Sequence, residues 1–568
     1  MNNNHPVLAS LGNVLQADQI AVSAKSKAHY RKGWRSGEGD ALAVLFPNTL
    51  RELWEALKVC VSHNCIIIMQ AANTGLTEGS TPSGSDYDRD VVVINTLAMD
   101  TIIPMGDAEQ IISFPGATLH QLESQLKLAS RAPHSVIGSS CLGASIVGGV
   151  ANNSGGALVK RGPAYTELSL FAWVNEKGEL ELVNHLGIDL GESPEEIISN
   201  LESGNFNRTI EPTDKVASAK DYVEKIRDVD ADTPSRYNAD ESKLYEASGC
   251  AGKIAVFAVR LDTFNVPKRE RTYYVGTNDP NTLAQLRRHI LSQFDNLPEV
   301  GEYLHRDIFD IAQIYGKDTF LSVKHLGTQR LPKLFALKGK LDQVFNNWKF
   351  VPNSLTDRAM QFASRLFPGH LPDRIIQYRQ KYEHHLILKM SDDGIGEADK
   401  YLAEFFKDGS AEGDYFVCNA DEASSAYLHR FAAAGAAVRY QTMHEKELGE
   451  IIALDIALRR NDLDWVEKLP PEIMDKIDKQ LYYGHFFCHV FHQDYVLKKG
   501  VDPKQLKKEL LSILDARGAK YPAEHNVGHL YKAESQLQKF YQKLDPTNTF
   551  NPGIGGDSKH KRNCSCCL

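Results

Sequence analysis

Apolar and polar residues follow one another in the first part of the chain as in a protein that mixes helices and strands. Short apolar runs bounded by turn residues predict strands. One longer segment, preceded by Pro47-Asn48-Thr49, has the apolar spacing of a helix. The predicted strands are 41–46, 65–70, 91–94 and 253–261, the helix is 50–62, and a second block of alternating elements runs over 110–183. This order favours layered helices and sheets over an all-β sandwich.

The remainder of the chain divides into further regions. Its 568 residues are several times the length of a typical domain, so two or three domains are expected. An acidic, polar stretch over 191–233 is typical of an exposed excursion. A strand followed by a helix over 271–294 indicates a new domain. We place the boundary near Val266-Pro267-Lys268, because proline and charge are common in linkers.

A basic region stands out in the middle of the chain. Residues 324–381 carry eleven Lys or Arg and three Asp, a net charge of +8 in a chain whose total is −9. Aromatic residues are interleaved with these charges, a mixture that lets a segment lie in an anionic phospholipid headgroup layer. The region therefore predicts peripheral membrane attachment. Two alternatives remain open: a solvated basic helical face above ordinary core aromatics, and a platform for single-stranded nucleic acid.

The whole-chain properties narrow the class of protein. The acidic total charge argues against nucleic acid as the main partner. No stretch reaches the roughly 18 to 20 apolar residues needed to cross a bilayer, and the first residues lack the pattern of a secretion signal. Six of the nine cysteines are scattered among apolar sequence, as is typical of reduced thiols in a cytoplasmic protein.

Two loops rich in small residues are the strongest cofactor signal. Neither a G-x-G-x-x-G after a strand nor a P-loop occurs, which argues against Rossmann-type NAD binding and P-loop nucleotide hydrolysis. Instead, residues 71–80 follow a strand, and residues 138–156 are dense in Gly, Ser and Asn. The first loop fits either a diphosphate cradle or a tight surface turn. Because the second is far longer, the pair predicts a long dinucleotide.

These loops, the strand entry at 248–256 and the endings 524–528 and 545–553 resemble the vanillyl-alcohol-oxidase type of FAD-binding fold. More closely, nearly the whole chain is similar to the bacterial respiratory FAD-dependent D-lactate dehydrogenases. The runs that carry this similarity are Tyr30-Arg-Lys-Gly33, Gly39-Asp-Ala-Leu42, Asp86-Tyr-Asp-Arg-Asp90, Lys381-Tyr-Glu-His-His385 and Tyr482-Tyr-Gly-His485.

The resemblance implies an α+β fold with a two-subdomain FAD-binding domain over 1–266, completed by 518–568. It also implies an α+β cap domain over 267–517, with the basic membrane-contact region 324–381 inside it. The residues expected to bind FAD are Ala71, Ala72, Asn73, Thr74, Gly75, Gly79, Ser80, Gly138, Ser145, Gly155 and Ile254. No histidine lies in 71–80, so we expect the FAD to be noncovalent.

Oxidation of a 2-hydroxy acid needs a base for the hydroxyl proton, a hydride acceptor and a cation for the carboxylate. His525 is our preferred base, with His489 as a second catalytic candidate. Arg374 and Lys381 are the expected carboxylate partners, because relatives supply cations in this region. These two residues also lie within the predicted membrane patch.

A metal site is implied by the same resemblance. Related dehydrogenases bind a divalent metal with two histidines seven positions apart and a glutamate that precedes a histidine, a pattern matched by His485, His492 and Glu524. Two imidazoles and a carboxylate suit Zn, Mn or Fe. If 485–492 were one strand, alternation would place the two histidines on opposite faces, so another feature must bring them together. The alternative is a set of hydrogen-bonded histidines without metal.

The resemblance implies oxidation of D-lactate to pyruvate, with electrons passing through FAD to a membrane quinone at the cytoplasmic face of the bacterial inner membrane. One alternative is a soluble FAD-dependent dehydrogenase of 2-hydroxyglutarate or glycolate that uses a protein electron carrier. The other is a catalytically inert peripheral membrane scaffold, which would be expected to have broken flavin loops. The loops of this chain are intact.

Overall fold

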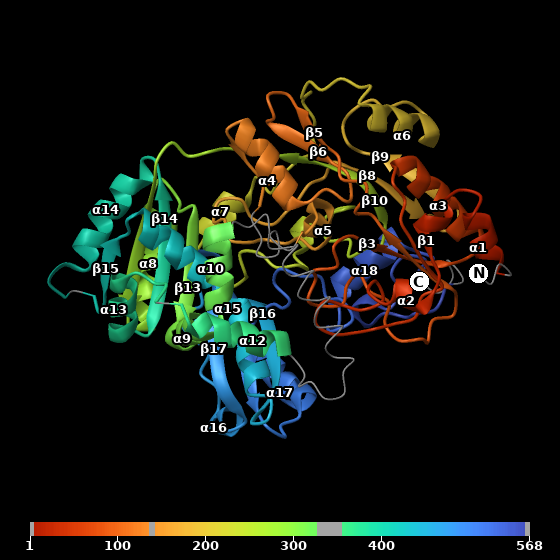
Figure 1. Cartoon of the computed structure of the whole chain (residues 1–568). Helices are drawn as coiled ribbons and strands as arrows, with labels where there is room; N and C mark the ends of the chain where they lie inside the picture. Colours follow the sequence, from red (N-terminus) through yellow and green to blue (C-terminus); the bar gives the residue numbers. More distant parts are fainter. Residues whose placement is uncertain (1–4, 136–142, 327–354, 368, 410, 563–568) are drawn as a thin grey trace.

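The computed structural model describes residues 5–135, 143–326, 355–367, 369–409 and 411–562. The expected site residue Gly138 lies outside these ranges. Residues 327–354, which make up about half of the basic region 324–381, also lie outside them. Two smaller sheets lie in the N-terminal part of the chain, and a larger one lies in the part coloured green to blue (Figure 1).

The first sheet contains three strands expected from the apolar runs, and these three pair in parallel. Its order is β1-β2-β4-β3, formed by Ile20–Ala21, Ala43–Leu45, Val91–Asn95 and Ile66–Gln70. Helix α3 (Leu50–Ser62) joins β2 to β3, and the Thr49 side chain accepts a hydrogen bond from the Glu52 amide at its start. The predicted helix is therefore confirmed over its full length. Strand β3 ends at Gln70, directly before the 71–80 loop.

The second sheet is antiparallel and has the order β5-β6-β10-β8-β9. Its strands are Ile102–Met105, Gln110–Ser113, Ala255–Asp262, Ser169–Val174 and Leu180–Asn184. Helices α4 (Leu119–Leu128) and α5 (Ile146–Ala151) pack on one face, and the other face shares a core with α3 and α6 (Pro194–Ser203). Much of the stretch 191–233 is exposed, as expected, but α6 within it packs on the core through Ile198 and Leu201.

The C-terminal segment returns to these two sheets (Figure 1). Phe550 forms a bridge with Ile67 of β3 and is fully buried in the core beneath the first sheet. Helix α18 (Ser535–Leu544) adds Leu537 and Tyr541 to a core that includes Ala251. Chain ends that are far apart in sequence therefore build one unit.

A seven-stranded antiparallel sheet of order β15-β12-β14-β13-β17-β18-β16 forms the other part. Its strands are Asp414–Val417, Glu270–Thr277, His384–Ser391, Val300–His305, Ile477–His485, Val490–Lys498 and Leu448–Ala457. One face is covered by α8 (Pro280–Gln293), α14 (Gly394–Phe405) and α17 (Pro503–Ala516). The opposite face is covered by α9 (Arg306–Tyr315) and α15 (Ala420–Met443).

Three more helices lie near α15 and include the described parts of the basic region. They are α10 (Lys317–Leu326), α12 (Leu355–Arg365) and α13 (Asp373–Lys381). Among the described residues, no helix is both long and apolar enough to cross a bilayer.

Candidate active site

The 71–80 loop presents unused backbone donors. Within the described part of the chain, no backbone N–H from Ala71 to Ser80 donates a hydrogen bond to protein. Side chains hold the loop instead: Asn73, at a φ of 51°, donates to the Lys32 carbonyl and accepts from the Ser80 hydroxyl. Since buried or partly buried N–H groups need a partner, this loop is suited to bind an anion such as a diphosphate.

Two glycines leave room beside these donors. A Cβ atom at Gly75 or at Gly143 would meet no described protein atom within 4 Å, and Gly143 has a φ of 91°. Just beyond Gly143, Ser145 begins α5 and accepts a hydrogen bond from the Gly148 amide. The two loops therefore combine free backbone donors with open space, and the residues present fit a dinucleotide such as FAD.

The other expected FAD residues have tighter surroundings. A Cβ at Gly79 would overlap the side-chain amide of Asn526, and one at Gly155 would overlap the guanidinium of Arg236. Ile254 is buried in the core beside α4 and α5. Gly79 and Gly155 thus let the cofactor loops approach residues that also lie near the histidines.

A hairpin explains how the two histidines meet. Strand β17 ends at His485, a short 3₁₀ turn follows over Phe486–Cys488, and β18 begins at Val490. His485 lies opposite Val490, and His492 lies opposite Tyr483. Cross-strand partners share a face, so both histidines point to the same side of the sheet, with ring centroids 5.5 Å apart. A single strand could not achieve this.

Glu524 completes the triad from the C-terminal segment. Its Oε2 lies 3.4 Å from His485 Nε2, and ligand atoms of His485, His492 and Glu524 all lie within 4.8 Å of one another. On the far side of the ring, His485 Nδ1 lies 2.6 Å from Glu302 Oε1, the carboxylate that typically orients a metal-binding imidazole. The donor set therefore fits a divalent Zn, Mn or Fe ion.

The charges around the triad perturb several pKa values. Burial alone would lower the pKa of His485, but the carboxylates of Glu302 and Glu524 outweigh burial and raise it to about 10. Burial would raise the pKa of Glu524, but His485 and Arg236 hold it well below its ordinary value. Burial and the charge of Glu524 raise the pKa of Asp455 to about 7. Such opposed shifts are typical of catalytic or metal sites.

His525 lies beside the triad, whereas His489 does not join it. His525 Nε2 is 4.0 Å from Asp455 Oδ2, and partial burial lowers the pKa of His525 despite the nearby Glu524. His489 instead follows the hairpin turn at a φ of 53°, and its Nδ1 lies 2.9 Å from the Arg459 carbonyl oxygen. The geometry therefore supports His525 as the base and gives His489 a structural hydrogen bond.

The predicted carboxylate partners are not brought to the triad. Arg374 Nε lies 2.7 Å from Glu422 Oε1, and its guanidinium stacks on Phe416. Lys381, at the end of the same helix, lies over the ring of Tyr382. Among the described residues, neither cation contacts the triad or His525, so their prediction as substrate ligands is not supported. The physical reason is that α13 directs Arg374 toward its ion-pair partner Glu422 and Lys381 toward the ring of Tyr382.

Sequence reasoning also missed residues that do lie at the triad. Glu302 comes from β13, Asp455 from β16, and Arg236 from the loop before the 3₁₀ turn Glu241–Lys243. Arg236 Nη2 lies 2.8 Å from Glu524 Oε1, and Asp455 accepts a hydrogen bond from the Glu524 amide. No local motif marks them, because strand pairing places Glu302 and Asp455 beside the histidines and a loop contact with Glu524 places Arg236.

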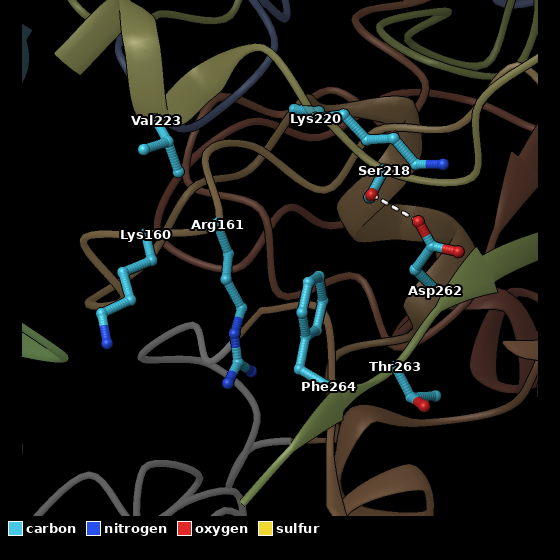
Figure 2. Close-up of a pocket in the computed structure, with 9 residues that line it drawn as sticks. Lys160, Arg161, Ser218, Lys220, Val223, Asp262, Thr263 and Phe264 are labelled. Atoms are coloured by element: carbon cyan, nitrogen blue, oxygen red, sulfur yellow. Dashed lines mark hydrogen bonds between the residues drawn. The ribbon is translucent and has the colours of Figure 1, made fainter. Parts of the chain in front are cut away.

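A separate hollow of about 300 Å³ lies where the second sheet approaches the cap (Figure 2). Arg161 stacks on Phe264 there, Ser218 donates a hydrogen bond to Asp262, and Lys160 lies 2.6 Å from Glu299 of the cap. None of its lining residues belongs to the triad or to the 71–80 loop. The hollow is therefore distinct from the candidate active site.

The fold and the cofactor loops define a class. Residues 41–182 match the FAD binding domain family. Among solved structures, p-cresol methylhydroxylase with substrate bound has a TM-score of 0.59 and 12% identity, with coverage of 97% of this chain and 96% of that one. An alkyldihydroxyacetonephosphate synthase also has a TM-score of 0.59, with 11% identity and coverage of 97% and 86%. The chain thus contains an FAD-binding domain of the fold seen in these proteins.

The sequence relatives are more specific. Residues 272–563 match the family described as D-lactate dehydrogenase, membrane binding. The quinone-dependent D-lactate dehydrogenases of Escherichia coli and Haemophilus influenzae are 58% and 56% identical, and each match covers 98% of both chains. The chain therefore belongs to the family of quinone-dependent D-lactate dehydrogenases, which confirms the resemblance and the expected FAD-binding fold.

Proposed function

We propose that this chain oxidises D-lactate to pyruvate and delivers the electrons to a membrane quinone. The observation that carries the proposal is its 58% identity over 98% of a quinone-dependent D-lactate dehydrogenase. The open space at Gly75 and Gly143 of the flavin loops supports it. When bound, FAD supplies the hydride acceptor for the Cα hydrogen. Residues 1–266 with 518–568 form the proposed FAD-binding domain, and 267–517 form the cap.

The chain's own residues perform the remaining tasks. The unused N–H groups of residues 71–80 would bind the cofactor diphosphate, with Gly143 to Ser145 beside it. His485, His492 and Glu524 would hold a divalent metal, whose charge would lower the pKa of the substrate hydroxyl. His525 takes the hydroxyl proton on its imidazole, whose Nε2 lies 4.0 Å from the carboxylate of Asp455. The resulting imidazolium is stabilised by that carboxylate.

We also propose attachment to anionic phospholipid at the cytoplasmic face of the bacterial inner membrane. The net charge of +8 over 324–381 supports this, as do apolar side chains on and just after α12. Phe362, Leu366 and Phe367 are 67%, 75% and 57% exposed, which is unusual for large apolar residues that have no lipid or protein cover. Residues 327–354 of the same region lie outside the described part of the chain.

An anaerobic spectral titration tests the reaction. The visible flavin absorbance of the purified protein should bleach with D-lactate and return on addition of a soluble quinone. L-lactate and D-2-hydroxyglutarate should leave the spectrum unchanged. Bleaching by D-2-hydroxyglutarate rather than D-lactate would favour the alternative dehydrogenase, and a protein that takes up no FAD would overturn the proposal.

Co-sedimentation with vesicles tests the attachment. Binding should be stronger to vesicles that contain an anionic phospholipid than to neutral ones, and it should weaken as salt rises, because salt screens exposed charges. Equal binding to neutral and anionic vesicles at all salt concentrations would contradict the electrostatic part of this proposal.

A further inference from the structure

Three histidines of the cap, outside the triad, carry ring nitrogens that no protein atom bonds. The ring of Phe309 lies between them, with its centroid 4.3 Å from that of His429 and 5.4 Å from that of His385, and His370 lies beyond His429. In the described part of the chain, His429 Nδ1, His370 Nε2 and both ring nitrogens of His385 are buried without a hydrogen-bond partner. Because unpartnered buried polar atoms are destabilising, this cluster is suited to a ligand that supplies the missing bonds.

His370 and His429 form the part of the cluster that a ligand can reach. Their ring centroids lie 6.3 Å apart, and His370 is partly exposed whereas His429 is 2% exposed. His429 Nε2 donates to the Phe309 carbonyl oxygen at 3.1 Å, which leaves Nδ1 as an acceptor. Burial lowers the pKa of His370 to about 4 and that of His429 to about 3, so both rings are neutral at neutral pH. The pair can therefore donate to a carbonyl oxygen through His370 and accept from a hydroxyl through His429.

Aromatic and exposed apolar side chains lie beside this pair. Phe320 of α10 is fully buried, and its ring centroid lies 4.5 Å from that of His370. His370 follows α12 in the chain, three residues after the 57% exposed Phe367, whose carbonyl accepts a hydrogen bond from Lys317 Nζ. Helices α10, α12 and α15 contact one another (Figure 1). A molecule dissolved in the lipid that these apolar side chains are proposed to enter would meet His370 first.

Helix α15 connects the histidine pair to the triad. It carries His429 and, as the next residue, Arg430. Arg430 Nε lies 2.7 Å from Glu302 Oε2, and the other oxygen of Glu302 lies 2.6 Å from His485 Nδ1. The pair is therefore joined to a ligand of the triad through one neighbouring residue and one carboxylate, and it lies on the side of the triad that faces α15.

We propose that His370 and His429 bind the head group of the membrane quinone, with Phe309 and Phe320 as its apolar neighbours. This inference rests on the proposed function and adds to it the site of the second substrate. The two electrons and two hydrogens that D-lactate loses on becoming pyruvate convert the quinone to the quinol, and FAD carries the electrons between the two. His370 donates to a carbonyl oxygen of the quinone, and His429 accepts from a hydroxyl of the quinol.

His370→Leu and His429→Leu test the assignment in the holoenzyme, with ubiquinone-1 as the quinone. Each change removes one hydrogen bond, so kcat/KM for ubiquinone-1 should fall about 10-fold. Its affinity for the oxidised holoenzyme, measured by calorimetry, should fall by a similar factor. Anaerobic bleaching by D-lactate should keep its rate, as should turnover with ferricyanide, which accepts electrons without these hydrogen bonds. His370→Asn should restore part of the quinone affinity.

His289→Leu is the matched control. His289 is also a partly exposed histidine of the cap, but it belongs to α8 on the opposite face of the sheet and stacks on Tyr401 with ring centroids 4.0 Å apart. This variant should keep the kcat/KM and the affinity for ubiquinone-1.

Unchanged kcat/KM and unchanged affinity for ubiquinone-1 in His370→Leu would overturn the assignment. An equal loss of turnover with ferricyanide would overturn it too, because the damage would then not be specific to the quinone. If His429→Leu fails to fold, the partly exposed His370 decides the outcome. An unmodified protein that D-lactate does not bleach would instead refute the proposed function, so the two failures are distinguishable.

Discussion

Glu302 and His485 lie opposite each other on β13 and β17, and their side chains meet at 2.6 Å between Oε1 and Nδ1. The pair is separated by 183 residues in sequence. It fixes which imidazole nitrogen remains for the triad, because Nδ1 is occupied and Nε2 faces Glu524. The proposed metal site thus depends on a residue that is not itself a ligand.

Glu302→Gln should weaken metal binding about 10- to 100-fold, because the amide orients and polarises the imidazole less well than the carboxylate. The bound metal can be measured by elemental analysis after dialysis against graded chelator. Glu299→Gln is the control, since Glu299 belongs to the Lys160 ion pair at the other hollow. Equal metal retention in both variants would contradict the orienting role.

Gly79→Ala should impair FAD retention and stability, because a Cβ at this position would overlap the Asn526 side chain. Overpacking of this kind typically costs about 1 to 3 kcal/mol. Thermal unfolding and the ratio of flavin to protein absorbance report the two effects. Gly435→Ala is the control, because its Cβ would meet nothing within 4 Å in helix α15. A Gly79→Ala protein with normal melting and full FAD would show that the contact between residue 79 and Asn526 tolerates a methyl group.

The rate of flavin reduction should fall at acid pH, and the midpoint of this acid limb should lie below the ordinary histidine pKa. His525 must be neutral to accept a proton, and partial burial lowers its pKa from 6.5, so activity should persist as pH falls through 6.5 and decline only below it. Stopped-flow reduction by D-lactate measures this limb.

His525→Gln should slow flavin reduction about 10²- to 10⁴-fold and abolish that limb, because glutamine cannot act as the base. The equivalent change at His489, which hydrogen-bonds the Arg459 carbonyl, should leave the limb in place. Near-normal reduction in His525→Gln would exclude His525 as the base.

Substitution of the exposed apolar side chains of α12 should release the protein from vesicles. Phe362→Ser should lower the bound fraction, because its 67% exposed ring would otherwise enter the lipid interface. Leu128→Ser is the control: Leu128 is 91% exposed and belongs to α4, outside residues 324–381. Equal loss of binding in both variants would argue for a nonspecific effect on the protein.

Local sequence patterns predicted the helices and strands whose start, end and apolar face are set by residues close together in the chain. Helix α3 has the expected bounds because its Thr49 cap and apolar spacing are encoded within a few residues. Strands β3 and β4 differ from the predicted ranges by a residue at one end. The sequence predicted the exposure of much of 191–233 but not the buried face of α6, because that apolar face is short and surrounded by acidic residues.

The amino-acid sequence by itself predicted the cofactor loops from their density of small residues, and the pattern His485, His492 and Glu524 from its resemblance to related dehydrogenases. Only the tertiary structure decided which residues meet. The β17–β18 hairpin turns His485 and His492 to one face, β13 supplies Glu302, and α13 carries Arg374 to Glu422 instead of the site. Pairing between strands distant in the chain sets these contacts, and local sequence does not encode that pairing.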